Sequence, residues 1–240
     1  MRMRMKRSSK ITARRVLSGA WCVVRLSMLT LALVLLGLFL LVIVYKYQPV
    51  TQTPFMAALA RKNNVEVSQN WVPLDKISRQ LPLAVVSSED NLFTKHNGFS
   101  FTAIKSAMSN NAKGKRIHGA STISQQTAKN VFLWNDRSWV RKGFEAVVTV
   151  MIECVWGKRR IMEVYLNVVE FGPGVYGAEA ASRKYFHHSA SRISQSEAAL
   201  MAAVMPNPVR LKIAAPSAYV CRRQAKIASL MRKIGTVRLE

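Results

Sequence analysis

A chain of 240 residues has room for one membrane segment and one globular domain, which excludes two large domains, because domains usually contain about 100–200 residues. The 36 Lys and Arg against 12 Asp and Glu give a net charge of +24, so the expected partner is anionic: nucleic acid, lipid headgroups or a phosphorylated substrate.

The N-terminal part of the chain predicts a membrane anchor. Residues 1–25 carry eight basic residues and no acid, and residues 26–45 carry no charge. The apolar run 31–44 lies within a stretch long enough to cross a bilayer, which requires about 20 residues. A cleaved signal peptide is the alternative, but its apolar region usually has only about 7–15 residues and ends at a small-residue cleavage site. The run here ends in the interfacial sequence Tyr45-Lys46-Tyr47, which favours one transmembrane helix over 26–45.

The charge distribution also predicts how the chain crosses the membrane. By the positive-inside rule, the basic tail 1–25 stays cytoplasmic and the rest of the chain lies outside the cytoplasm. That placement argues against nucleic acid as the partner. We expect the polar, proline-containing segment 46–70 to be a stalk and residues 71–240 to form the globular domain.

The globular part has mainly helical periodicity. Apolar residues recur at i, i+3, i+4, i+7 and i+8 from Phe144 to Ile152, and similar spacing follows from Ile161 to Val168 and from Ala198 to Met205. Alternating strand patterns are scarce, so we predict a mainly α fold. Cys154 and Cys221 show no spacing pattern, which favours two free, buried thiols over a disulfide.

The segment 81–93 contains the first candidate for chemistry. Leu81, Val85, Glu89 and Leu92 fall on one helix face, and Asp90 lies beside Glu89. Burial and a neighbouring negative charge both raise the pKa of a carboxyl group toward the value that a general base needs. A Glu that only bonds a backbone amide at the edge of an amphipathic helix is the structural alternative.

Five ordered motifs then resemble one enzyme family. They are Glu-Asp-x-x-Phe-x-x-His-x-Gly-Phe over 89–99, Gly-x-Ser-Thr-Ile-x-Gln-Gln-x-x-Lys-Asn over 119–130, and the segments 141–145, 158–167 and 198–206. Together they are similar to the peptidoglycan glycosyltransferase family over roughly residues 70–215. The chain contains no Ser-x-x-Lys motif for a transpeptidase domain, so it is similar to the monofunctional biosynthetic transglycosylases of that family.

The resemblance implies a fold, a reaction and a location. The fold is a lysozyme-like helical head with a smaller apolar jaw against the membrane. The reaction joins a growing lipid-linked glycan to lipid II, with inversion, on the periplasmic side of a bacterial inner membrane. The implied partners are lipid II, the growing glycan and inner-membrane lipids, while cell-wall synthesis or division proteins are left open. No cofactor is required, and help from Mg or Mn is left open.

The resemblance also assigns the site residues. Glu89 matches the general base, and Lys129 and Arg137 match the cations that receive the departing diphosphate, whose growing negative charge requires fixed positive charge. Glu145 is the second carboxylate, either touching substrate or only pairing with Arg141 four residues earlier. The predicted substrate-binding set is completed by Asp90, Phe93, His96, Thr122, Gln125, Gln126, Asn130, Arg141 and Lys142.

Other interpretations are weaker. The G-x-G-x-x-G sequence at 172–177 resembles a dinucleotide loop, but the spacing before it is helical and Pro173 removes an amide. The adjacent pair His187 and His188 lacks the companions of a metal site, and no metal is predicted. A lytic enzyme with the same head fold is the runner-up, because it also needs a protonatable Glu. A non-catalytic scaffold that binds anionic wall polymer is the alternative from another class.

Overall fold

The computed structural model describes residues 2–102, 105, 121–136 and 138–239, with side chains from Trp21 onward. It divides into two compact units, Met1–Leu41 and Val42–Glu240. Helix α1 (Arg2–Tyr47) supplies the first unit, and its stretch Trp21–Tyr47 is long and apolar enough to cross a membrane. The transmembrane segment expected at 26–45 lies inside this stretch.

The last residues of α1 belong to the second unit. Trp156 Nε1 donates to the Val42 carbonyl at 2.7 Å, and the Arg160 guanidinium donates to the Tyr45 carbonyl at 3.0 and 2.7 Å. The Tyr45 ring lies 5.9 Å from the Phe132 ring, which lies 5.8 Å from Trp156. Since the last carbonyls of a helix lack partners within it, Arg160 satisfies a group that would otherwise be unpaired.

Residues 46–70 differ from the expected stalk, because they contain a packed helix. Helix α2 (Pro54–Asn63) begins after Thr53, whose Oγ1 accepts from the Met56 amide at 3.2 Å. Pro54 occupies the first turn, where a missing N–H costs nothing. Met56 and Ala60, one turn apart, are buried, and α2 packs on α5.

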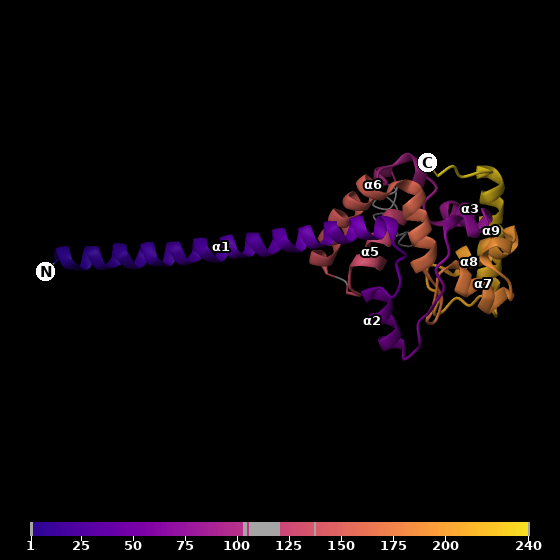
Figure 1. Ribbon diagram of the computed structural model, residues 1–240, viewed down its shortest axis with the longest axis horizontal. Helices are drawn as coiled ribbons and strands as arrows, with labels where there is room; N and C mark the ends of the chain where they lie inside the picture. The colour runs from indigo at the N-terminus through magenta and orange to yellow at the C-terminus, as the bar shows by residue number, and fades with distance from the viewer. Residues whose placement is uncertain (1, 103–104, 106–120, 137, 240) are drawn as a thin grey trace. The chain divides into compact units, whose positions relative to one another are not determined.

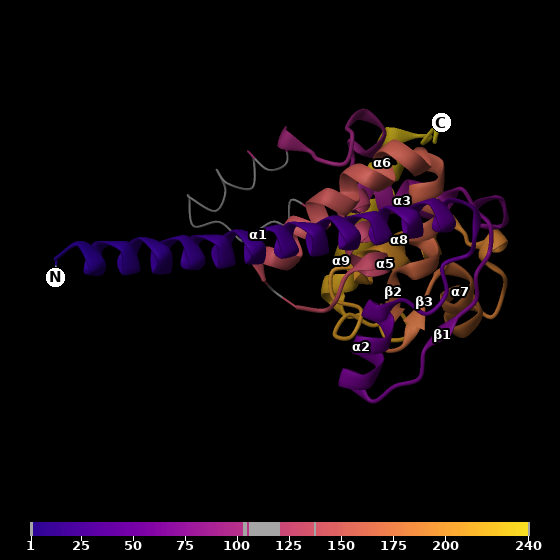
Figure 2. The same cartoon turned by 60° about the vertical axis from the view of Figure 1, so that its left-hand side comes forward.

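The remaining elements confirm the mainly α fold (Figures 1 and 2). The helices are α3 (Gln80–Glu89), α5 (Ile123–Phe132), α6 (Trp139–Val168), α7 (Ala178–Phe186), α8 (Gln195–Val204) and α9 (Ala218–Ile234). Short 3₁₀ turns occupy η1 (Leu74–Lys76), η2 (Phe93–Lys95) and η3 (Ala190–Arg192). Strands β1 (Ser68–Gln69), β2 (Glu170–Gly172) and β3 (Val175–Tyr176) form a sheet of order β1-β3-β2, in which β1 is parallel and β2 antiparallel to β3.

This sheet explains the glycine-rich sequence at 172–177. Gly174 lies in the turn between β2 and β3 with φ +73°, and a Cβ there would lie 2.3 Å from the Glu66 carbonyl oxygen. Gly177 has φ +85°, and a Cβ there would lie 2.7 Å from the Asn167 carbonyl oxygen. These glycines permit a turn and a close backbone approach, so the sequence does not form a strand-to-helix dinucleotide loop.

The helices of the second unit pack in two groups. Helix α5 packs along α6, while α3 packs on both α8 and α9, as Figures 1 and 2 show. Helix α6 is interrupted at Gly157, which has φ 71°, so the motif at 141–145 and the motif at 158–167 lie on separate helical segments. The largest fully buried side chains come from several of these elements and include Leu81, Phe93, Ile152, Ile161 and Tyr165.

The cysteines are free but exposed, so the expectation of buried thiols was wrong. Cys154 follows the buried Ile152 by two positions on α6, and a two-residue step turns a helix by about 200°, to the opposite side. Cys221 follows the buried Val220 on α9 and faces solvent.

Asn167 joins the start of the globular unit to the end of α6. Its Nδ2 donates to the Val72 carbonyl at 2.9 Å and to the Glu163 carbonyl at 2.8 Å, and its Oδ1 accepts from the Val72 amide at 2.9 Å. The side chain is fully buried. The side-chain amide of Asn167 therefore satisfies both backbone polar groups of Val72, a residue outside regular structure.

We expect Asn167→Ala to lower the free energy of unfolding by about 2–3 kcal/mol, because each polar group left unpaired in the interior costs ~1–3 kcal/mol. Urea unfolding of the full chain in detergent measures this. The exposed Asn97→Ala is the matched control and should change stability by less than about 0.5 kcal/mol. Equal effects of the two substitutions would show that the Asn167 bonds contribute nothing.

Candidate active site

A pocket of about 260 Å³ contains the predicted general base. Glu89 is the last residue of α3, and its side chain is 16% exposed. Gln126 Nε2 donates to Glu89 Oε2 at 3.3 Å, and Arg223 Nη2 donates to Oε1 at 3.4 Å. The pocket is lined by Glu89, Ser121, Gln125, Gln126, Lys129, Glu145, Met205 and Pro206.

The surroundings of Glu89 make its carboxylate a stronger base than an ordinary glutamate. Burial raises the pKa of Glu89 and is the largest effect. The hydrogen bond from Gln126 and the charge of Arg223 lower the pKa, while the charge of Asp90 raises it. The resulting pKa lies above the usual value, in the direction that the sequence pattern predicted.

A cationic cluster surrounds Glu145, which also lines the pocket. Glu145 is buried, and Arg141 Nη1 donates to its Oε2 at 2.6 Å while Lys142 Nζ pairs with its Oε1. Lys129 lines the pocket, and its Nζ lies 5.0 Å from the centre of the Phe55 ring. Burial lowers the pKa of Lys129, the charge of Glu145 raises it, and Arg141 and Lys142 lower it further. Both oxygens of Glu145 are thus occupied by neighbouring cations, which favours an orienting role over contact with substrate.

The start of α5 positions several predicted residues. Thr122 is its N-cap: the Thr122 Oγ1 accepts from the Gln125 amide at 3.2 Å and donates to the Gly98 carbonyl at 2.6 Å. Gln125 Oε1 accepts from the Thr122 amide at 3.0 Å, which completes a capping box. Asn130 is buried further along α5, and its Oδ1 has no hydrogen-bond partner among the described residues. The side chains of Thr122 and Gln125 therefore hold the helix start in place beside the pocket.

Three predicted substrate-binding residues, Asp90, Phe93 and His96, are not among the residues that line the pocket. Asp90 accepts from the Ile123 amide at 3.1 Å and pairs with His96 Nε2 at 2.9 Å. Phe93 is fully buried, and its ring lies edge-on to His96 at 6.4 Å. None of the three lines the pocket, because their side chains bind the 90–99 segment to the start of α5. Arg137 lies outside the described residues.

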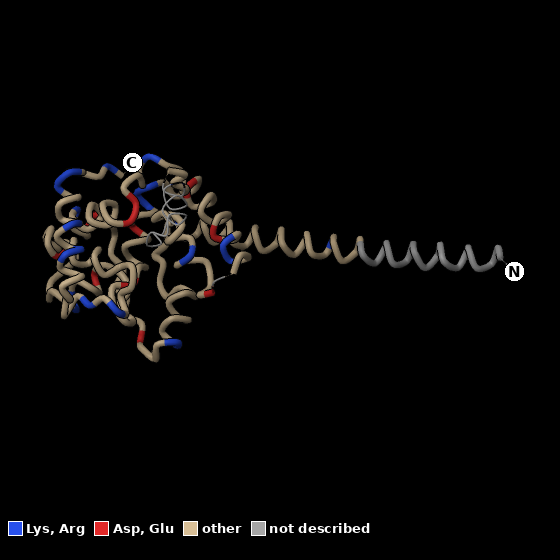
Figure 3. The backbone as a smooth tube through the Cα atoms, turned by 180° about the vertical axis from the view of Figure 1, so that it is seen from behind, with Lys and Arg blue, Asp and Glu red and all other residues tan. Residues whose placement is uncertain are grey.

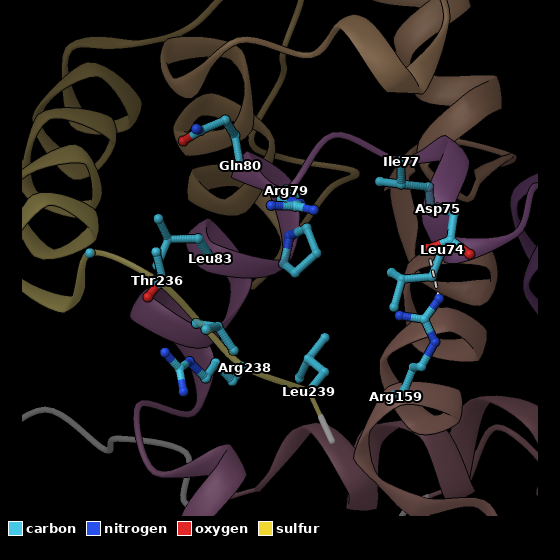
Figure 4. A pocket seen from close by; sticks show the side chains of 13 residues that line it. Leu74, Asp75, Ile77, Arg79, Gln80, Leu83, Arg159, Thr236, Arg238 and Leu239 are labelled. Carbon is cyan, nitrogen blue, oxygen red and sulfur yellow. Dashed lines mark hydrogen bonds and ion pairs between the residues drawn. The ribbon is translucent and has the colours of Figure 1, made fainter.

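A larger pocket of about 580 Å³ lies at the other end of α3 and differs in chemistry (Figure 4). It is bordered by Arg79, Arg159 and Arg238 and by the C-terminal segment 235–239. The one carboxylate in its lining, that of Asp75, accepts from Arg159 at 2.7 Å, as the dashed line in Figure 4 marks. The Asp75 side chain is 77% exposed, whereas Glu89 is 16% exposed and shares its pocket with Lys129, so the smaller pocket is the candidate active site.

The described residues contain no group of three or more His, Cys, Asp or Glu side chains placed to hold a metal ion. His188 instead pairs with Glu197 at 3.0 Å, and His187 ends α7 with φ 62°.

Comparison with known proteins shows the family of the chain. Residues 56–232 match the family described as Transglycosylase. A "Biosynthetic peptidoglycan transglycosylase" of Bacteroides thetaiotaomicron is 53% identical over 197 residues, 80% of this chain and 79% of the relative. Proteins of that name from Cronobacter sakazakii (57% over 166 residues; 69% of each chain) and Caulobacter vibrioides (49% over 201 residues; 83% and 87%) are also similar.

The chain belongs to the transglycosylase family. It is a glycosyltransferase of peptidoglycan synthesis, as the motifs predicted. The matched range extends from α2 through most of α9, so it includes the residues around the pocket and also Arg223, which lies beyond the five sequence motifs.

Sequence reasoning missed two residues that contact the candidate site in this transglycosylase. Tyr165 is fully buried, and its hydroxyl donates to Gln126 Oε1 at 3.0 Å. Arg223 bonds Glu89 from α9. A signal for Arg223 was present, since it follows Val220 by three positions and precedes Ile227 by four, which places a charge on the apolar face of that helix.

The raised pKa of Glu89 predicts a cost in stability. In the unfolded chain a Glu titrates near about pH 4.3, whereas in the folded protein Glu89 keeps its proton to higher pH. The protonated Glu89 therefore contributes stability that is fully present below about pH 4. This contribution is lost as the pH rises through the folded pKa. We expect Glu89→Gln to raise the Tm at pH 7 by about 2–4 °C, the shift that ~1 kcal/mol produces in a domain of this size.

The difference in Tm should shrink as the pH falls toward about 4, because both proteins are then neutral at this position. The exposed Glu66→Gln makes the same chemical change and should leave Tm unchanged. A Glu89→Gln protein that melts below wild type at pH 7 would contradict the raised pKa.

Proposed function

We propose that this transglycosylase polymerises lipid II into β-1,4-linked glycan by direct, inverting displacement of a lipid diphosphate. The observation that carries the proposal is that Glu89, a carboxylate with a raised pKa, and Lys129, a partly buried cation, line the same pocket. A base and a fixed positive charge in one pocket suit a reaction that removes a proton at one end and releases an anion at the other.

The proton is removed by Glu89. In the proposed step, the carboxylate takes the proton of the 4-hydroxyl of lipid II as that oxygen attacks the anomeric carbon of the growing chain. A C–O bond forms on the β face while the C–O bond to the diphosphate breaks on the α face. The electron pair of the broken bond leaves with the diphosphate, so no glycosyl-enzyme intermediate is formed.

The leaving diphosphate is received by Lys129, together with Arg137, which the family resemblance assigns to this task. Glu145 supports this role by holding Arg141 and Lys142 in place through both of its carboxylate oxygens. Buried ammonium groups interact strongly with charge that develops beside them, because few water molecules screen the interaction. A lytic enzyme has no such anion to receive, so the cationic cluster favours synthesis over cleavage.

Gln126 holds the candidate base in place. It donates to Glu89 through Nε2 and accepts from Tyr165 through Oε1, so its orientation is fixed. We expect Gln126 to orient the base, and Ser121, Gln125 and Asn130 to offer hydrogen bonds to sugar or diphosphate oxygens. We expect no transpeptidase activity, since the sequence has no Ser-x-x-Lys motif.

The apolar helix supports a place at the membrane. We propose a single-pass protein of a bacterial inner membrane, with residues 1–25 in the cytoplasm and the pocket on the periplasmic side, where the basic block before the apolar run predicts it. Two reporters are fused after Glu240, one that is active only outside the cytoplasm and one that is active only inside it. We expect activity from the first and none from the second. Activity of a cytoplasmic reporter alone would overturn this topology.

The proposed function is tested by incubating the purified full chain with lipid II. Wild type should form polymer, and Glu89→Gln should lose about 10²–10⁴ in rate, the contribution of a general base, while still binding lipid II. The exposed Glu66→Gln is the control and should polymerise normally. A Glu89→Gln protein within about tenfold of wild type would exclude Glu89 as the base and leave Glu145 as the carboxylate to test.

Lys129→Ala should reduce turnover by ~10²–10³, as loss of one stabilising group at a developing anion does elsewhere. The reduction should appear in kcat more than in KM, because the charge on the diphosphate grows as the bond breaks. Exposed Lys76→Ala provides the control for loss of a lysine charge. Wild-type turnover in Lys129→Ala would move the role elsewhere in the cationic cluster.

A further inference from the structure

Arg223 reaches the candidate base from a helix that none of the five motifs includes. Its Nη2 lies 3.4 Å from Glu89 Oε1, and the two side chains are 27% and 16% exposed. Helix α9 packs on α3, the helix that ends in Glu89. Arg223 is therefore held against Glu89 by contact between two helices far apart in sequence.

Arg223 lies, partly exposed, on the packed side of α9. Val220, Ile227 and Met231 form the buried face of α9, and Arg223 lies among them in sequence spacing. Gln224, the next residue, donates to the Ser196 carbonyl at 3.0 Å and fixes the helix against α8. The Arg223 Nε is buried and has no hydrogen-bond partner among the described residues. The carboxylate of Glu89, 3.4 Å away, is the opposite charge that faces this partly exposed guanidinium.

We propose that Arg223 is a positioning residue that keeps the Glu89 carboxylate ionised and oriented toward the pocket in the free enzyme. The proposal rests on the proposed function of Glu89 as the base. It assigns to α9 a part in the reaction, although Arg223 itself need not touch the sugars.

The groups around Glu89 show why a cation is needed there. Burial is the largest influence on the pKa of Glu89 and favours the protonated carboxyl, as does the charge of Asp90. A protonated Glu89 cannot accept the hydroxyl proton. Each element packed around Glu89 brings different groups near it. The charged or titratable ones are Asp90 after α3, Lys129 on α5, Glu145 and Tyr165 on α6, and Arg223 on α9. The residues after α8, Met205 and Pro206, carry no charge.

Among these groups, Arg223 is the cation that lowers the pKa of Glu89. Its effect is smaller than that of burial, so Glu89 keeps a raised pKa and remains a better base than an exposed glutamate. The pair thus balances two requirements: Glu89 must be ionised before the reaction, and basic enough to take a proton during it. Figure 3 shows basic residues recurring along the C-terminal helix, and Arg223 differs from its exposed neighbour Arg222 by its contact with a carboxylate.

The test compares Arg223→Gln with Arg222→Gln, which removes the same charge one residue away on the exposed side of α9. The carboxyl of Glu89 is titrated in the full chain in detergent by ¹³C NMR of labelled glutamate, with its signal identified by its absence in Glu89→Gln. We expect the Glu89 titration to move upward by about one pH unit in Arg223→Gln, the lower end of the effect of a nearby opposite charge. Arg222→Gln should leave it in place.

The rate of lipid II polymerisation should follow the same shift. In Arg223→Gln the acid limb of the pH–rate profile should move upward with the titration, giving about a tenfold loss below the limb and rates that approach wild type above it. Arg223→Lys restores a positive charge and should recover part of the shift. Arg223→Met keeps the length and packing of the side-chain stem without the charge. It replaces Arg223→Gln in the test if that variant folds poorly, and the Glu89 titration should move upward by the same amount.

The outcomes separate this inference from the proposed function. An unchanged Glu89 titration in both neutral variants overturns the role of Arg223, whatever Glu89 does. A rate reduced equally at every pH, with no shift in titration, also overturns it, because a purely structural role has that effect. A shifted titration with an unshifted pH–rate profile supports the pairing of Arg223 with Glu89 and overturns Glu89 as the base.

Discussion

The site depends on one buried carboxylate, that of Glu89 at the end of α3. Burial alone would leave it protonated over more of the pH range, and an ordinary exposed glutamate would be a weak base. The pKa of Glu89 is set between these two cases. Burial and Asp90 disfavour its negative charge, while Gln126 and Arg223 stabilise it. Each of these groups comes from a segment that must pack correctly for the balance to hold: α5, α9 and the end of α3.

The rest of the fold holds those segments together. The capping box of Thr122 and Gln125 and the Asp90–His96 pair fix the start of α5, from which Gln126 and Lys129 project. Glu145 on α6 binds Arg141 and Lys142. Near the end of α6, Asn167 hydrogen-bonds to the segment that precedes α3. Several polar residues that surround the pocket therefore have structural bonds, and only a few side chains remain to meet a substrate.

The sequence predicted the helical fold and the apolar N-terminal helix, because these depend on local periodicity. Motifs of contiguous residues also singled out five of the residues that line the pocket: Glu89, Gln125, Gln126, Lys129 and Glu145. Glu89 was identifiable from one helix face. The packing of α2 was not, since Pro54 looked like a break and only the tertiary structure shows Met56 buried. Asp90, Phe93 and His96 were grouped with the substrate-binding residues; in the structure they contact one another or the start of α5, and none lines the pocket. Spacing places Arg223 on the apolar face of its helix, but it cannot identify a partner 134 residues away.

The most direct measurement of the central claim is the pH dependence of the initial rate of lipid II polymerisation by the wild-type full chain. We predict that the rate rises with pH through one ionisation whose midpoint lies above about 4.3, the value of an exposed glutamate, because the buried Glu89 must lose its proton before it can act. The residual rate of Glu89→Gln should lack this step. A wild-type rate that stays constant down to about pH 4, or a step of the same midpoint in Glu89→Gln, would contradict the account.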